Sequence, residues 1–273
     1  MDTPLNWHAA AHYSGRIDFS FTTELSHNLW KAHLKEHIRC DERLSRLFEH
    51  GPTPDADSVR IIDPLYPQAL KAQAFAPPIL YFSGRKSLFK GAHISMVGSR
   101  KSTHLGRQFA HQLSAHAVTL GYTVVSGLAY GIDEAAHRGA LSHTIGVMGQ
   151  GILAKRSGSR RQLCDSILKA GGLLISEYPP AHVPQKWTYL HRNRLIAWMG
   201  NPFILVEAAQ RSGAMNTTRI ALNAGKKIYV VPHHPLVQTA EGCLKLLLDG
   251  ACPLIHHTQL KPPKRLNGDF IPE

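Results

Sequence analysis

The sequence predicts an α/β fold in which a parallel β-sheet is flanked by helices. Two consecutive strand–turn–helix units indicate this fold. The first unit is a buried strand at 93–97 and a helix at 105–120, whose apolar residues recur at helical spacing. The second is a strand at 122–125 and a helix from about Gly131. Strands joined by a short turn and one helix lie parallel with right-handed crossovers, so these units predict the centre of the sheet.

The same alternation continues to the end of the chain. A bent, proline-marked connector at 66–78 leads into the first expected strand. Strands are expected at 79–82, 144–148, 173–176, 203–206 and 228–231. Further helices are expected at 163–170, 195–199, 212–224 and 243–248. Gly121 and Gly225 follow helical segments and predict helix ends, because the left-handed conformation favoured there suits glycine.

A turn-forming run at 51–55, Gly-Pro-Thr-Pro-Asp, divides the chain. Before it we predict two short helices, the first capped by Thr23, which are too small to fold alone. We therefore expect a helical N-terminal segment and linker at 1–57 and an α/β domain at 58–260. The remaining tail, 261–273, is rich in proline and charge and is predicted to be disordered.

The net charge of +12 is concentrated in the α/β domain. Residues 1–60 hold seven Lys and Arg against nine Asp and Glu, whereas residues 61–273 hold 24 against ten. The larger part of the chain therefore carries a net charge of +14. This balance favours a polyanionic partner such as nucleic acid.

The cysteines and the hydropathy pattern bear on location. Cys40, Cys164, Cys243 and Cys252 are scattered without a Cys-x-x-Cys pair, which predicts reduced thiols and a cytoplasmic protein. The sequence has no apolar run near the roughly 18 residues that a membrane helix needs. Its N-terminus lacks the basic and apolar regions of a signal peptide. We expect no membrane contact.

Turns that follow strands or open helices should converge on one edge of a parallel sheet. They are Gly98-Ser99-Arg100, Ser126-Gly127, Gly149-Gln150-Gly151, Arg192-Asn193-Arg194 and Ser212-Gly213 with Thr217. Exposed N–H groups and helix N-termini at such an edge favour phosphate. Arg100 adds a guanidinium beside the potential capping residues Ser102 and Thr103. The basic run 155–161 follows a strand on the same edge.

Each of these features also has a structural interpretation. Gly98 and Gly127 can serve tight turns alone, and a run of basic residues is often a solvated loop. Arg192 and Arg194 are expected at a helix start, where two cations oppose the helix dipole. A bound anion would compensate them, and so would a carboxylate of the chain such as Glu207.

Motifs of several other site classes are absent from the sequence. It has no His-Glu-x-x-His motif and no spaced Cys/His quartet, so we expect no metal site. It also has no P-loop, no Gly-x-Gly-x-x-Gly and no Gly-x-Ser-x-Gly. We therefore predict neither a cofactor nor a catalytic constellation.

The turns and their surroundings resemble the DNA-processing protein A family (DprA, also called Smf). The shared motifs are Val-Gly-Ser-Arg at 97–100, Ser-Gly-Leu-Ala-x-Gly-Ile-Asp-x-x-Ala-His-x-x-Ala-Leu at 126–141, Gly-Gly-x-x-x-Ser-Glu-Tyr-Pro at 171–179, Arg-Asn-Arg-x-Ile-Ala at 192–197, and Val-Glu-Ala with Ser-Gly-x-x-x-Thr within 206–217. The resemblance covers roughly residues 63–255. The chain departs from the family pattern at 149–156, at Tyr189-Leu190, at His233 and at Leu244, as a short and divergent member would.

The resemblance implies an extended Rossmann-like fold that binds single-stranded DNA. It further implies protection of incoming DNA, help in loading RecA recombinase during natural transformation or homologous recombination, and a homodimer without established catalytic activity. With the turns, it gives as candidate DNA-binding residues Gly98, Ser99, Arg100, Ser102, Thr103, Arg107, Gly127, Lys155, Arg156, Arg192, Asn193, Arg194, Ser212, Gly213 and Thr217.

Two alternatives remain open from the sequence. Related Rossmann-like families hydrolyse nucleotide N-glycosidic bonds with an Arg and a Glu, which Arg192 or Arg194 could imitate together with Glu207. The Pro-Gly-Gly turn of those phosphoribohydrolases is missing here. The other alternative is a nucleotide-sensing module, which would need a mononucleotide pocket instead of a long basic surface.

Overall fold

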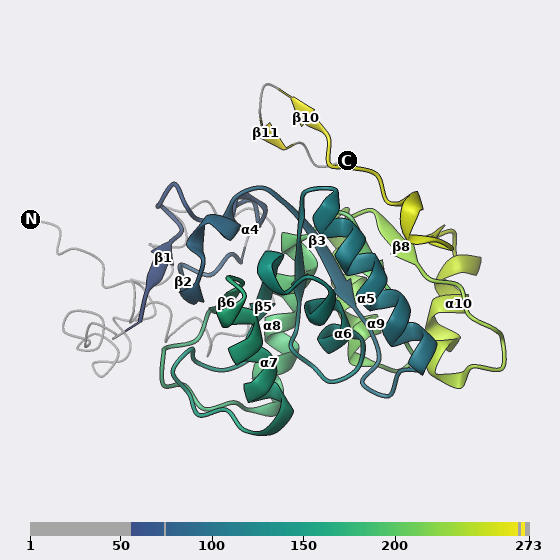
Figure 1. Ribbon diagram of the computed structural model, residues 1–273, viewed down its shortest axis with the longest axis horizontal. Coiled ribbons are helices and arrows are strands. Elements are labelled where there is room, and N and C mark those ends of the chain that lie inside the picture. The colour runs from purple at the N-terminus through teal and green to yellow at the C-terminus, as the bar shows by residue number, and fades with distance from the viewer. Residues whose placement is uncertain (1–55, 74, 267–268, 271–273) are drawn as a thin grey trace, which may run out of the picture.

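The computed structural model describes residues 56–73, 75–266 and 269–270 (Figure 1). The N-terminal helices expected from the sequence, and most of the linker after them, lie outside the described residues. The described chain forms a sheet covered by helices on both faces, as the strand–helix alternation predicts.

Nine strands form one sheet in the order β1-β2-β6-β5-β4-β3-β7-β8-β9. They are β1 (Ser58–Arg60), β2 (Ile79–Gly84), β3 (Ala92–Val97), β4 (Tyr122–Ser126), β5 (Thr144–Val147), β6 (Leu173–Ser176), β7 (Phe203–Leu205), β8 (Ile228–Val230) and β9 (Cys252–Pro253). Strands β3 to β9 are parallel, as predicted for β3 to β8; the short β9 was not predicted. In contrast, β2 runs antiparallel to both β1 and β6, so the sheet is mixed. The partner of β2 lies far along the chain, and local sequence therefore carried no signal of its direction.

The described residues form seven helices. They are α4 (Gln68–Lys71), α5 (His104–Thr119), α6 (Ile132–Gly139), α7 (Gly158–Lys169), α8 (Lys186–Met199), α9 (Gly213–Asn223) and α10 (Glu241–Leu248). Helices α5 and α6 bury Leu113 and Ile132 against Ile94 of β3, and α7 continues this layer. Helices α8 and α9 bury Leu195 and Ala221 on the opposite face (Figure 1).

The strand order reverses between β3 and β7. From β3 the chain adds β4, β5 and β6 on one side, then crosses through α8 to β7 on the other side. Ligands of open α/β sheets bind outside the carboxyl ends of the strands at such a reversal. The loops at this carboxyl edge are 98–103, 127–131, 148–157, 177–185, 206–212 and 231–240.

Three segments differ from the prediction. Helix α8 begins at Lys186, so Arg192 and Arg194 lie inside the helix and not at its start. Helix α7 begins at Gly158, which moves part of the basic run from a loop into its first turn. The tail was expected to be disordered, but its described part contains a short hairpin of β10 (Arg265–Leu266) and β11 (Asp269–Phe270).

Candidate nucleic-acid interface

The turn after β3 packs closely against neighbouring loops. A Cβ atom on Gly98 would lie 2.6 Å from Cγ1 of Ile132 and 2.9 Å from the carbonyl oxygen of Glu207. The backbone N–H of Ser99 donates to that same carbonyl oxygen at 2.6 Å. Glycine is therefore required at position 98 for the close approach of three segments.

The backbone N–H groups that the sequence predicted to bind phosphate donate instead to a carboxylate of the chain. Asp133, in the first turn of α6, accepts hydrogen bonds from the backbone N–H groups of Ala129, Gly98 and Gly127. Burial raises the pKa of Asp133, and the nearby guanidinium of Arg192 acts in the opposite direction. The glycine N–H groups thus bind an internal anion, which agrees with the structural interpretation of Gly98 and Gly127.

Arg192 is buried, with 4% of its surface exposed. Its guanidinium donates to the carbonyl oxygens of Gly127, at 2.5 Å, and of Val147. Burial lowers the pKa of Arg192 to about 10, while the charge of Asp133 opposes this decrease. Arg192 therefore fastens α8 to the carboxyl ends of β4 and β5.

Arg194 forms an internal ion pair, with Glu177 at the end of β6. It also donates to the carbonyl oxygen of Phe75 at 2.8 Å and lies over the ring of Trp198. Burial opposes ionisation of Glu177, but the charge of Arg194 and the His191 ring, whose Nδ1 lies 3.4 Å from Oε1 of Glu177, outweigh it and lower the pKa of Glu177. The Arg–Glu pair that the sequence suggested is present, but Glu177 takes the place expected for Glu207.

The Glu207 carboxylate is fully buried and fastens the start of α5. It accepts from the Thr103 N–H at 3.0 Å, from the Thr103 hydroxyl at 2.8 Å and from the Thr239 hydroxyl at 2.5 Å. The hydroxyl of Thr103 in turn accepts from the Gly106 N–H and caps the helix. Among the hydrogen bonds of the described residues, Glu207 has no arginine partner, so the Glu–Arg pair needed by a hydrolase is not formed there.

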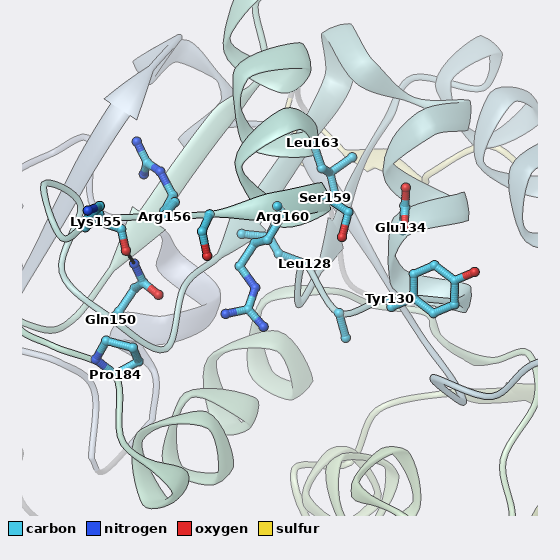
Figure 2. A pocket seen from close by; sticks show the side chains of 13 residues that line it. Leu128, Tyr130, Glu134, Gln150, Lys155, Arg156, Ser159, Arg160, Leu163 and Pro184 are labelled. Carbon is cyan, nitrogen blue, oxygen red and sulfur yellow. Dashed lines mark hydrogen bonds between the residues drawn. The ribbon is translucent and has the colours of Figure 1, made fainter.

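Exposed cations lie around a cavity of about 390 Å³ formed by the loops after β4, β5 and β6 (Figure 2). Lys155 is exposed, and Arg156 is half-buried with one nitrogen donating to the carbonyl oxygen of Ile152 at 3.1 Å. Arg160 extends across the middle of the cavity in Figure 2 and donates to the Tyr189 hydroxyl at 2.8 Å. Its guanidinium also lies 5.2 Å from the centre of the Tyr189 ring.

One acid, Glu134, is among the residues that line this cavity. Its carboxylate pairs with Arg138 at 2.7 Å, so its charge is compensated from within α6. Arg100 is exposed on the neighbouring loop after β3. The cavity and its surroundings thus carry a clear excess of positive charge.

The remaining candidates mostly serve the helix ends. Ser212 caps α9 by accepting from the Met215 N–H, and the buried Thr217 donates to the carbonyl oxygen of Gly213. Arg107 is partly exposed and donates to the carbonyl oxygen of Ser102 at 2.5 Å. Ser102 is buried, and its hydroxyl has no hydrogen-bond partner among the described residues. Ser99 and Asn193 are partly exposed, and Gly213 is exposed.

The structure therefore separates the predicted residues into two groups. Arg100, Lys155 and Arg156 reach the surface of the carboxyl edge, whereas Arg192, Arg194 and the glycine N–H groups are committed to bonds within the protein. Sequence reasoning did not select Arg160 and Asp133. Arg160 is part of the basic run 155–161. The helix that carries it, α7, was expected to begin at 163 but begins at Gly158. Asp133 lies in the family motif at 126–141, but nothing in the neighbouring sequence indicates which groups it binds.

No group of three or more His, Cys, Asp or Glu side chains among the described residues is arranged to hold a metal ion. No helix within the described ranges is long and apolar enough to cross a membrane.

Comparison with protein families gave a match to the model of DNA recombination-mediator protein A over residues 57–261. Protein Smf of Synechocystis sp. is 36% identical over 205 residues, which cover 72% of this chain and 51% of that protein. The DNA processing protein DprA of Bacillus subtilis is 34% identical, covering 77% of this chain and 71% of its own length. The chain thus spans about half of the first relative and about seven tenths of the second.

Two solved structures are similar over most of the described chain. The X-ray structure of DNA processing protein A from Streptococcus pneumoniae has a TM-score of 0.70 and 27% identity, covering 94% of this chain and 92% of that one. A structure from Helicobacter pylori, described for the unique single-stranded DNA binding mode of DNA processing protein A, has a TM-score of 0.66 and 26% identity. That similarity covers 76% of this chain and 94% of the other.

Proposed function

Because the chain belongs to the DNA recombination-mediator protein A family, we propose that it binds single-stranded DNA across the carboxyl edge of its parallel sheet. One observation carries the proposal: the exposed Lys155 and the half-buried Arg156 and Arg160 line a cavity whose one acid among the described residues is already paired. The relative from Helicobacter pylori binds single-stranded DNA, which supports the same class of ligand here.

Phosphate groups are the proposed partners of the exposed cations. Arg100, Lys155 and Arg156 lie on the loops after β3 and β5, and Arg160 lies in the first turn of α7. Guanidinium groups bind phosphate through paired N–H donors, and a lysine adds a point charge. Four cations on adjacent loops can therefore follow a sugar–phosphate backbone.

Bases would stack on aromatic side chains beside these cations. Tyr130 is 63% exposed and Trp187 is 39% exposed, and both lie on loops of the carboxyl edge or at the start of α8. Stacking on aromatic rings tolerates any base, so we expect weak sequence preference. A duplex hides the faces of its bases, so single strands should bind more tightly.

The candidates that are buried, or that are bonded within the protein, have a supporting role in this proposal. Gly98, Ser102, Thr103, Gly127, Arg192, Arg194, Ser212 and Thr217 would hold the loops that present the cations. The partly exposed Ser99, Arg107 and Asn193 and the exposed Gly213 remain candidate contacts with the strand.

We further propose that the bound strand is protected and passed to RecA recombinase, in natural transformation or homologous recombination. The description of the family as a recombination mediator supports this role. It would place the protein in the cytoplasm, where its cysteines stay reduced; Cys164, Cys243 and Cys252 are free. We propose no turnover of nucleotides, because Glu207 is committed to Thr103 and Thr239.

A gel-shift series with single- and double-stranded oligonucleotides at increasing salt tests DNA binding. We expect tighter binding of single strands and a slope of log affinity against log salt of about 0.7 per phosphate contact. Arg100→Ala should lower both the affinity and the slope, while Lys90→Ala, at the opposite edge of the sheet, should change neither. Equal affinity for duplex, or a normal slope in Arg100→Ala, would show that this edge is not the site.

A further inference from the structure

A second hollow lies beside the cavity, in a groove between α5 and α6. Its volume is about 580 Å³. One wall is a single face of α5, formed by His104, Arg107, Gln108 and His111 at helical spacing. The other wall consists of Tyr130 and residues of α6. The function proposed above includes Tyr130 and Arg107 but not the rest of this groove.

The groove is continuous with the cavity. Tyr130 and Glu134 line both hollows, so the two meet at these residues. In Figure 2 both side chains lie at the end of the cavity away from Lys155. At its other end the groove closes, because α6 touches α5 where Gly139 lies against the carbonyl oxygen of His111. The two hollows form one path with a definite end.

The chemistry of the groove suits a single nucleic-acid strand. Arg107 donates to the carbonyl oxygen of Ser102, and among the ion pairs of the described residues it has no carboxylate partner. Arg138 neutralises Glu134, the acid among the lining residues. Imidazole, phenol and guanidinium planes offer stacking surfaces for bases.

We propose that single-stranded DNA, after crossing the cavity, passes Tyr130 and continues into the α5–α6 groove. This inference rests on the proposed function and lengthens the proposed DNA path by the stretch that lies in the groove. From His104 to His111 the helix rises about 10 Å, which allows only a few nucleotides before the groove closes. The groove should therefore add affinity only for oligonucleotides longer than the cavity itself holds.

Gln108 offers a sharp test because it lies on the exposed wall of α5 and can be exchanged without altering the core. Gln108→Glu adds a negative charge to the groove in a side chain of nearly the same shape. Gln108→Lys adds a positive charge at the same position of α5. Fluorescence anisotropy with labelled oligothymidylates of about 6 and about 15 nucleotides reports binding to the two lengths.

We expect Gln108→Glu to weaken binding of the longer oligonucleotide about two- to fivefold and Gln108→Lys to strengthen it by a similar factor. Both variants should bind the shorter oligonucleotide as the wild type does. Arg100→Ala, in contrast, should weaken binding of both lengths. Lys90→Glu provides a charge change at the opposite edge of the sheet and should alter neither.

The outcomes separate the two proposals. If the Gln108 variants keep the wild-type ratio of affinities while Arg100→Ala weakens both lengths, the groove is not part of the path and the proposed function stands. If the wild type binds neither oligonucleotide, the proposed function fails and the groove fails with it. Melting temperatures of the variants, compared with the wild type, show whether α5 remains folded.

Discussion

Arg192 is held inside the protein by partners that compensate its charge. The carbonyl oxygens of Gly127 and Val147 accept its hydrogen bonds, and Asp133 supplies a negative charge nearby. Burying a charge costs several kcal/mol unless it is paired and hydrogen-bonded. These partners belong to the loop after β4, the end of β5 and the first turn of α6, so one side chain fixes the geometry of the carboxyl edge.

Removing this side chain should destabilise the protein. We expect Arg192→Ala to lower the free energy of unfolding by about 3–5 kcal/mol, because Asp133 would remain buried without its cation. Arg100→Ala removes an exposed side chain and should change it by no more than about 0.5 kcal/mol. Urea denaturation measures both values. Similar losses in the two variants would contradict the bracing role of Arg192.

His137 should make stability depend on pH. Burial, with the charge of Arg192 as a smaller cause, lowers the pKa of His137 from 6.5 to about 3. Between these values the unfolded chain binds a proton that the folded protein does not, so stability should decrease as pH falls from about 6.5 towards 3. His137→Gln, which cannot gain that proton, should show a weaker decrease in urea denaturation over this range. An unchanged pH dependence would argue against a neutral, buried imidazole.

The pattern of glycine turns with arginine is the same whether the N–H groups bind phosphate or a carboxylate of the chain. The sequence therefore predicted which turns lie at the carboxyl edge. It could not show that Asp133 accepts hydrogen bonds from the N–H groups of Gly98 and Gly127. Only the three-dimensional arrangement brings α6 into these turns. Exposed cations such as Arg100 and Lys155 were easier to place, because loop residues after a strand tend to reach the surface.

Only the second half of helix α8 could be predicted from the spacing of apolar residues. Its last turns carry the apolar residues Leu195, Ile196 and Met199, and those were recognised from the sequence. Its first turns contain Trp187, Tyr189 and Leu190, but these side chains are exposed or half-buried and form no apolar face towards the core. The start of the helix is set by a capping box, in which Gln185 and Thr188 each accept from the other's backbone N–H. Parallel strands were predicted well, since buried strands read as short apolar runs.

Thr188 should contribute to stability well beyond its size. Its hydroxyl is buried, belongs to the capping box and donates to the carbonyl oxygen of Gly149 at 2.6 Å. Thr188→Ala should lower the free energy of unfolding by about 1–2 kcal/mol. Thr119→Ala, at the exposed end of α5, is a matched control with an expected loss of about 0.5 kcal/mol or less. Chemical denaturation that gives equal losses would argue against the capping role.

At the scale of the whole molecule, the two edge strands of the sheet, β1 and β9, differ in their surroundings. On the β1 side the described chain adds an antiparallel pair, whereas the β9 side ends in a strand of two residues. Large apolar side chains are exposed on the segments around α10 and β9: Leu236 at 84%, Leu248 at 89% and Ile255 at 68%. Exposed apolar side chains that form a patch are typical of a contact with another protein surface.

These side chains support the proposal of a homodimer, and its expected interface can be tested. Leu236→Glu combined with Leu248→Glu should shift the protein from dimer to monomer, because each charge would be buried against the partner copy. Light scattering at micromolar concentration measures the mass. Ile62→Glu, next to β1 and also exposed, is the control and should leave the dimer intact. A wild-type protein of monomer mass would contradict the homodimer itself.

The path of the chain through α8 has a consequence for the order of folding. Arg192 bonds to residues 65 and 45 positions earlier, and Glu207 reaches back 104 positions to Thr103. Contacts between such distant positions form late, because a long loop must close before they are made. A chain emerging from the ribosome can pair β3 with β4 and β4 with β5 early, but its carboxyl edge stays open until α8 and β7 have been synthesised. We therefore expect affinity for DNA to arise at the end of synthesis, so that incomplete chains do not compete for the strand.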